Sequence, residues 1–343
     1  MRGLARRFRT FLRSLTEWKR KPITLGFMEH IADIEADQVN LAPIVIRYAN
    51  VYRDGNAGKW GALLTQSSTS IHDYKWTEGM DASLQFAEDY KLKYYYHTLL
   101  WSKADFFPTL AQGYDVRTRA TREPDNDTHI SAIMNRYKGR LYRVDVWNEV
   151  LNSTGAIEST GGVEILTVDE FAHSFALAHS IDPKAKLGYN DFGIEHSASK
   201  FTGAIQLISD IRDAGGHVDF LGFQFHVDLT DLPTYDEMVN KFRTCRDNNI
   251  EPVVSELDIR THDFIQAGNT FDQAEAAQAA FVKDLMRACR DGGCEEVNVW
   301  GVNHSGTWIH DRDGTDLTTE RPLPFEDDFT PNAFARALWK FSR

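Results

Sequence analysis

The sequence predicts an α/β fold, a single-domain (β/α)8 TIM barrel, and three observations support this fold class. Eight short apolar runs rich in β-branched and aromatic residues recur along the 343 residues. Segments with a helical spacing of apolar residues separate most of these runs, and such alternation favours a parallel sheet. The chain has neither a GxGxxG turn after a first strand nor a GxxxxGK[ST] loop, so the competing doubly wound nucleotide-binding sheet lacks support.

The predicted elements follow one another in a regular order along the chain. The strands are expected at residues 23–28, 44–52, 92–101, 140–148, 186–190, 218–225, 251–257 and 295–301. The helices are expected at residues 80–90, 168–180, 202–215, 235–247, 271–290 and 331–341. Eight strands with helices between them close most naturally into a barrel, whose catalytic groups lie at the C-terminal ends of the strands.

The first 21 residues differ from the rest in charge, with eight Lys or Arg and one acid. Their apolar residues have helical spacing and are Leu4, Phe8, Phe11, Leu15 and Trp18. We expect residues 1–21 to form a basic amphipathic helix packed on the barrel formed by residues 22–343, with a membrane-surface helix as the alternative. Charges interrupt any apolar core, so a signal peptide is not predicted. Secretion with an earlier leader removed and a cytoplasmic location both stay open.

The net charge of −12 restricts the partners that the chain can bind. Outside the first 21 residues, 49 acidic residues oppose 30 basic ones, and such a body repels nucleic acid and anionic membranes. We therefore expect a neutral or cationic ligand, no nucleic acid and a monomeric chain. No stretch approaches 18 uncharged apolar residues, so no transmembrane helix is predicted.

The three cysteines do not form a disulfide framework or a zinc site, because none has metal-site spacing with a histidine partner. Cys289 and Cys294 are five residues apart and could close a small loop, which would leave Cys245 unpaired. The spacing leaves open whether this disulfide forms.

Polar and aromatic side chains collect at the predicted strand ends. These residues are Asn56, Lys59, His97, Trp101, Asn148, Glu149, Asn190, Asp191, Gln224, His226, Glu256, Asp258 and Trp300. A random set of strand ends would not contain so many acids, amides, imidazoles and indoles. The tryptophans could serve as platforms for sugar rings, although a large core also needs aromatic residues.

Glu149 and Glu256 end the fourth and seventh predicted strands, which face each other across a barrel mouth. Two opposed carboxylates are what cleavage of a glycosidic bond requires. We expect Asn148 to hydrogen-bond a sugar hydroxyl, and His226 and Asp258 to hold Glu256 in place. In the alternative interpretation, each glutamate is a solvated residue that caps the next helix.

The ordered motifs resemble glycoside hydrolase family 10, the endo-1,4-β-xylanases. They are HTLLW at 97–101, DVWNE at 145–149, YNDFGIE at 189–195, GFQFH at 222–226, SELDI at 255–259 and VWGVNHSGTW at 299–308, with a looser match of GNAGKWG at 55–61. The resemblance covers about residues 25–340 and implies a (β/α)8 barrel that cleaves internal bonds of xylan, or xylo-oligosaccharides, with retention of configuration. The alternatives are another β-glycan as substrate, or a carbohydrate-binding protein without activity.

The resemblance implies that Glu149 is the acid/base and Glu256 the nucleophile, supported by His226, Asp258 and Asn148. It implies no metal and no cofactor. The residues that it assigns to sugar binding are Asn56, Lys59, Trp60, His97, Trp101, Asn190, Gln224, Trp300 and Trp308. Family members often carry a disulfide before the last strand, near Cys289 and Cys294.

Four positions depart from the family pattern. Gly55 stands where the family has Glu, Gly58 where it has Met, Ser102 where it has His, and His304 where it has Asp. The family glutamate contacts the second sugar outward from the cleaved bond, so we expect that subsite to be altered.

Overall fold

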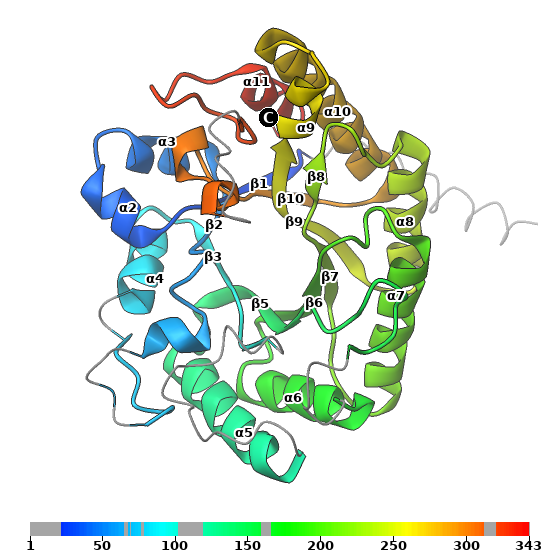
Figure 1. The fold of residues 1–343 in the computed structure, drawn as a ribbon. Coiled ribbons are helices and arrows are strands. Elements are labelled where there is room, and N and C mark those ends of the chain that lie inside the picture. The colour runs from blue at the N-terminus through cyan, green and yellow to red at the C-terminus, as the bar shows by residue number, and fades with distance from the viewer. Residues whose placement is uncertain are drawn as a thin grey trace, which may run out of the picture.

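The computed structural model describes residues 22–64, 68, 70–76, 79–101, 119–158, 166–311 and 320–342. Their central feature is a closed ring of parallel strands in the order β10-β1-β2-β3-β5-β6-β7-β9, in which β9 also pairs with β10 (Figure 1). The ring strands are β1 (Thr24–Met28), β2 (Val51–Arg53), β3 (Lys93–Tyr96), β5 (Leu141–Asn148), β6 (Lys186–Asp191), β7 (Phe220–Phe223), β9 (Glu251–Arg260) and β10 (Glu296–Val299). Two short strands, β4 (Leu100–Trp101) and β8 (His226–Asp228), pair with β5 and β9 at their C-terminal ends. The predicted (β/α)8 barrel is confirmed.

Helices surround this ring on its outer side (Figure 1). They are α2 (Ile31–Ala36), α3 (Leu41–Tyr48), α4 (Met80–Asp89), α5 (Arg119–Arg136), α6 (Val168–Ile181), α7 (Ala198–Asp213), α8 (Tyr235–Asp247), α9 (His262–Gln266), α10 (Phe271–Gly292) and α11 (Ala333–Trp339). All six predicted helices are present. The predicted N-terminal helix within residues 1–21 lies outside the described residues. In the part of the chain that the structure describes, no helix is both long and apolar enough to cross a membrane.

The predicted second strand, residues 44–52, is wrong over most of its length. Residues Leu41–Tyr48 form α3, and only Val51–Arg53 form a strand. The run Ile44, Val45 and Ile46 is β-branched, but Ile44 and Val45 share one buried helical face with Leu41. Short apolar runs do not distinguish a strand from a buried helix, and here packing against the barrel decides.

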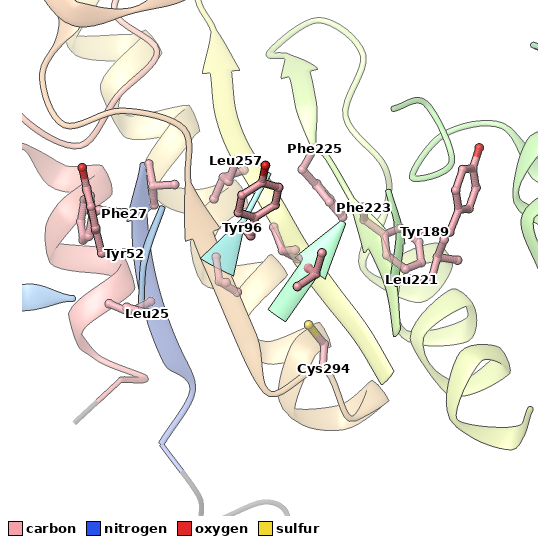
Figure 2. Close-up of a cluster of buried hydrophobic side chains, with 14 of the residues drawn as sticks. Leu25, Phe27, Tyr52, Tyr96, Tyr189, Leu221, Phe223, Phe225, Leu257 and Cys294 are labelled. Atoms are coloured by element: carbon pink, nitrogen blue, oxygen red, sulfur yellow. The ribbon is translucent and has the colours of Figure 1, made fainter. Parts of the chain in front are cut away.

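Two apolar clusters fill the outer and inner sides of the ring. The larger includes Phe27, Tyr52 and Phe223, labelled in Figure 2, together with helix residues such as Leu285 and Phe334. It therefore lies between strands and helices.

The smaller cluster is Val51, Tyr95, Phe220 and Val253, and it fills the barrel interior. The rings of Tyr95 and Phe220 meet edge to face with centroids 5.7 Å apart, although their strands β3 and β7 are not neighbours. Such a packed apolar layer separates the two ends of the barrel.

The three cysteines are buried free thiols, so the possible disulfide between Cys289 and Cys294 is not formed. Burial and a hydrogen bond with Cys294 raise the pKa of the Cys289 thiol. The Cys294 thiol donates to the carbonyl oxygen of Glu296 at 3.3 Å. Gly293, in the left-handed conformation, ends α10 between the two thiols and turns the chain toward β10.

Candidate active site

Glu149 and Glu256 lie at the C-terminal side of the barrel and are joined by a chain of side-chain amides. Gln224 Nε2 donates to Glu149 Oε1 at 2.9 Å, and Asn190 Nδ2 donates to Glu256 Oε1 at 2.7 Å. Both amides also reach Asn148 Oδ1, at 3.5 Å from Gln224 and 2.9 Å from Asn190. The carboxylates are 7% and 3% exposed, so a bound group would meet both in a largely dry setting. The structure thus brings together the two glutamates and three of the predicted polar residues.

His226 and Asp258 form the predicted support for Glu256. His226 lies between the two carboxylates, with Nε2 3.1 Å from Glu256 Oε2 and Nδ1 2.8 Å from Asp258 Oδ2. Burial alone would raise the pKa of Glu256, but the His226 hydrogen bond and the charge of Arg53 hold it at about 2. Burial also opposes protonation of His226, yet the two carboxylates raise its pKa to about 10. At neutral pH Glu256 is therefore ionised beside a cationic imidazole.

Arg53 is the main site residue that sequence reasoning missed. It is fully buried, its Nη1 donates to the Ser255 carbonyl at 2.9 Å, and its Nη2 lies 3.0 Å from Asp145 Oδ2 and 3.6 Å from Glu256 Oε1. The guanidinium centre is 4.7 Å from the ring centroid of Trp300. The predicted second strand ended at residue 52, one position before this arginine. The position of Arg53 at the end of a strand was the feature of the sequence that could have identified it as a site residue.

Asp145, also missed, is the acceptor at the centre of this buried network. Besides Arg53, it accepts the hydroxyl of Tyr95 at 2.7 Å and binds His97 Nδ1 at 2.8 Å. Burial and the charge of Arg53 lower the pKa of His97, so its imidazole is neutral at physiological pH. With Nδ1 directed to the carboxylate, Nε2 is left as an acceptor for a ligand hydroxyl.

Among the described residues, ligand atoms of His97, Asp145 and Glu256 lie close enough together to hold a metal ion. However, the Arg53 guanidinium already lies on the same carboxylate oxygens, Asp145 Oδ2 and Glu256 Oε1. A divalent cation there would face a fixed positive charge, so this donor set does not suit a metal.

The predicted tryptophans Trp300 and Trp308 form an aromatic wall beside the carboxylates. Trp308 Nε1 donates to Asp258 Oδ2 at 2.8 Å, which ties this ring to the His226 support. The Trp300 ring lies edge to face with His97 and His226, at centroid distances of 5.4 and 6.2 Å.

Lys59, Asn56 and Trp101 form a second edge of the site. Lys59 Nζ donates to Asn56 Oδ1 at 2.8 Å and lies 5.1 Å from the Trp101 ring centroid. Burial lowers the pKa of Lys59, although the charges of Glu256 and Glu149 partly oppose the effect.

Trp60, which the family resemblance assigned to sugar binding, has a packing role in this structure. Its ring stacks on His129 with centroids 4.0 Å apart, and its Nε1 donates to the Ile71 carbonyl at 2.7 Å.

Gly58, next to Lys59, is in unusually close contact with strand β3. The Tyr96 hydroxyl donates to the Gly58 carbonyl at 2.6 Å, and a Cβ at this position would lie 2.5 Å from the carbonyl oxygen of His97. At Gly55 a Cβ would instead meet the Met28 sulfur at 2.9 Å and His30 Cε1 at 3.0 Å. The family residues Met and Glu therefore do not fit at these positions without local movement.

The backbone of Glu149 is in the left-handed region, with φ of 54°. Phe225, the residue after Gln224, is in the same region with φ of 57°. Non-glycine residues rarely adopt this conformation, which stores strain and is concentrated at functional sites. The Glu149 amide is held by the Asn190 carbonyl at 2.9 Å. The two hydrogen-bonded side chains, Glu149 and Gln224, thus lie at and next to positions of rare backbone conformation.

Comparisons with known proteins agree with this geometry. The chain is 33% identical over 192 residues to "Endo-1,4-beta-xylanase 1" of Humicola insolens, an alignment that covers 56% of this chain and 44% of that relative. The chain thus spans less than half the length of that relative, and also of "Endo-1,4-beta-xylanase A" of the same organism.

The fold matches that of native xylanase 10B from Thermotoga maritima with a TM-score of 0.81, at 21% identity, over 96% of this chain and 97% of that one. A model of glycosyl hydrolase family 10 matches residues 16–340, nearly the whole chain. This protein, whose barrel holds two buried glutamates connected by hydrogen-bonded side-chain amides, belongs to glycosyl hydrolase family 10.

Proposed function

We propose that the chain is a retaining endo-1,4-β-xylanase that acts on xylan or xylo-oligosaccharides. The observation that carries the proposal is the unequal setting of the two buried carboxylates. Glu256, with a pKa of about 2 beside a cationic His226, is fixed in its ionised form, whereas Glu149 accepts a hydrogen bond from the neutral Gln224 amide. A retaining glycosidase needs this division between a permanent carboxylate and a group that exchanges a proton.

In the proposed first step, Glu256 attacks the anomeric carbon while Glu149 donates its proton to the leaving oxygen. The glycosidic C–O bond breaks and a covalent glycosyl-enzyme forms. Glu149, now a carboxylate, then removes a proton from water, whose oxygen displaces Glu256 and restores the original configuration. The Glu256 carboxylate is released in its starting state.

The sugar is positioned by donors and acceptors that the protein leaves unsatisfied. Asn148 Nδ2 is buried and has no hydrogen-bond partner among the described residues, so it is left to donate to a sugar hydroxyl. The neutral His97 offers an acceptor on the same side. Xylose lacks the exocyclic CH2OH of glucose, so a site walled by Trp300 and Trp308 favours xylan by exclusion.

The experiment compares wild type, Glu256→Ala and Glu149→Ala on soluble xylan and on β-glucan, with and without added azide. We expect xylan cleavage with a β-configured first product, and loss of about 10³-fold or more in Glu256→Ala. Azide should restore turnover in Glu256→Ala and give an α-glycosyl azide, because it replaces the nucleophile while Glu149 still protonates the leaving oxygen. In Glu149→Ala it should give a β-glycosyl azide from an aryl β-xyloside, whose leaving group departs without a proton, because azide replaces the water of the second step.

An α-configured first product would contradict the retaining mechanism. Cleavage of β-glucan in preference to xylan would contradict the substrate. Cleavage confined to short xylo-oligosaccharides would keep the mechanism and assign the difference to the altered loop around Gly55.

A further inference from the structure

We propose that the N-terminal mouth of the barrel, opposite the two glutamates, is a binding site for a small oxyanion of the phosphate class. A cavity of about 370 Å³ lies there. Its lining includes Thr24, Lys93, Lys186, Glu251 and Glu296, the first residues of β1, β3, β6, β9 and β10. Because the strands are parallel, this is the far end of the barrel, and the proposal does not depend on the proposed function.

Arg143 is the central group of this cavity. It lines the wall, is 4% exposed, and uses two of its nitrogens on acids: Nε lies 3.1 Å from Glu296 Oε2, and Nη2 lies 3.0 Å from Glu251 Oε2. Its Nη1 is buried and has no hydrogen-bond partner in the described ranges. A buried donor of a charged group is rarely left unpaired, so a ligand or ordered water belongs there.

The two acids that hold Arg143 are already satisfied by protein donors. Glu296 Oε2 also accepts the Tyr142 hydroxyl at 3.0 Å, and its Oε1 accepts Asn298 Nδ2 at 3.1 Å. Glu251 Oε1 accepts from Lys186 Nζ. Every carboxylate oxygen of this pair is engaged, so neither acid is available to neutralise a further cation or to bind a metal.

Lys93 gives the cavity a further donor. This exposed lysine has Nζ 4.2 Å from the Tyr142 ring centroid, a cation–π contact that uses none of its N–H groups as a hydrogen-bond donor to an oxygen. Arg246 and Glu295 also line the wall, and each has a partner of its own. A group rich in acceptors and negatively charged is therefore the ligand that this lining recognises.

The size of the cavity also favours a ligand over one bridging water. A water molecule occupies about 30 Å³ of liquid volume, so the space is large compared with a single solvent molecule. A tetrahedral oxyanion offers several acceptors, and hydrogen bonds from guanidinium and ammonium groups such as those of Arg143 and Lys93 are strong.

The test is isothermal titration of the full chain with inorganic phosphate at constant ionic strength, with sulfate and acetate as comparison anions. We expect saturable one-site binding of phosphate and sulfate, weaker binding of acetate, and affinity at least about tenfold lower in Lys93→Gln, which removes one charge-assisted hydrogen bond. Lys283→Gln, which removes an exposed lysine of α10, should bind phosphate as wild type does.

Absence of saturable binding, or equal losses in Lys93→Gln and Lys283→Gln, would overturn the site. Hydrolysis by Lys93→Gln should equal that of wild type, since the site lies at the other end of the barrel. Loss of activity together with loss of phosphate binding would mean that the substitution acts on the fold, and a thermal unfolding scan of both variants identifies that case. Phosphate affinity should then be measured in Lys93→Met, which removes the charge but keeps an apolar stem on the Tyr142 ring, and unchanged binding would again overturn the proposal.

Discussion

Arg53 places a positive charge below the proposed nucleophile without exposing it to solvent. A single nitrogen of Arg53, Nη2, forms ion pairs with the carboxylates of both Asp145 and Glu256, and the guanidinium centre lies 4.2 Å from the Tyr95 ring centroid. Burial weakens the screening of that charge by water, so it helps to lower the pKa of Glu256 although Asp145 lies closer to the guanidinium. The arginine is therefore a positioning and electrostatic residue for the carboxylate rather than a group that touches the sugar.

We predict that Arg53→Met moves the acid limb of the kcat/KM profile to higher pH. The pKa of Glu256 is lowered partly by this charge, so its removal lets burial raise the pKa and leaves the carboxylate protonated over a wider acid range. The measurement is kcat/KM on xylan from about pH 2, the pKa of Glu256 in wild type, up to about pH 8. Arg53→Lys keeps the charge and should keep the acid limb, while losing the bond to the Ser255 carbonyl. An unchanged acid limb in both variants would contradict the electrostatic role.

At the scale of elements, caps and buried ion pairs help to hold the helices in place, and α6 shows both. Thr167 and Glu170 form a reciprocal capping box at the start of α6, and Arg122 of α5 binds the same Glu170 with Nε and Nη2 at 2.6 and 2.8 Å. This pair is buried and bidentate, so it joins α5 to α6 as well as capping the helix.

Glu170→Ala should therefore cost far more stability than loss of a cap. Removing one partner of a buried, bidentate ion pair typically costs about 3–5 kcal/mol. Glu237 closes an equivalent capping box with Thr234 at the start of α8 but is exposed, so Glu237→Ala should cost about 0.3–1.5 kcal/mol. Urea denaturation of both variants measures the difference, and equal costs would show that Arg122 contributes little.

A predicted run overlaps every strand of the ring, whereas helices α2, α3, α5 and α9 were not expected, and particular elements show the physical reasons. The apolar spacing of α8 and α10 predicts both helices. A Thr directly before each helix, with Glu or Gln three residues after that Thr, marks where each one starts. In contrast, α5 has few apolar residues and carries Pro124, so its sequence resembles a loop. Strands β3 and β4 were predicted as one continuous strand, because the break between Tyr96 and Leu100 depends on how each of them pairs with β5.

The residues of the site were predictable where they project from a strand end, and less so where they lie inside the barrel, below the two glutamates. Glu149, Glu256, His226 and Asp258 each belong to an ordered motif, and the structure gathers them. Arg53 acts from inside the barrel, and its neighbours across the ring are separated from it by 92 and 202 residues of chain. No local pattern reports such contacts, because they exist only once the ring has closed.

The whole molecule is a barrel with charge at both ends and an apolar layer between them. Its global stability is coupled to pH through buried ionisable groups, of which Glu29, at the end of β1, is the simplest case. This side chain is 3% exposed, and burial raises the pKa of its carboxyl from 4.5 to about 7. Because the folded state holds the proton more tightly, this group stabilises the fold below pH 4.5 and that contribution is lost as the pH rises to 7.

We predict that Glu29→Gln removes this pH dependence. The free energy of unfolding of wild type should fall relative to that of the variant between pH 4.5 and 7, by up to about 3 kcal/mol. Denaturant unfolding of both proteins across this range gives the difference. Glu35→Gln, at an exposed position of α2, should run parallel to wild type, and a parallel curve for Glu29→Gln would show that burial does not control this group.

The tight contact at Gly58 has a consequence for how this chain can change. A Cβ at position 58 is blocked by a backbone oxygen, whereas a Cβ at position 55 meets the ends of two side chains that can rotate. A glutamate at position 55 therefore needs only side-chain rotations of Met28 and His30, but a methionine at position 58 needs the main chain at Gly58 or at His97 to move. A single substitution can introduce the first family residue, whereas the second requires a compensating change in the backbone that surrounds it.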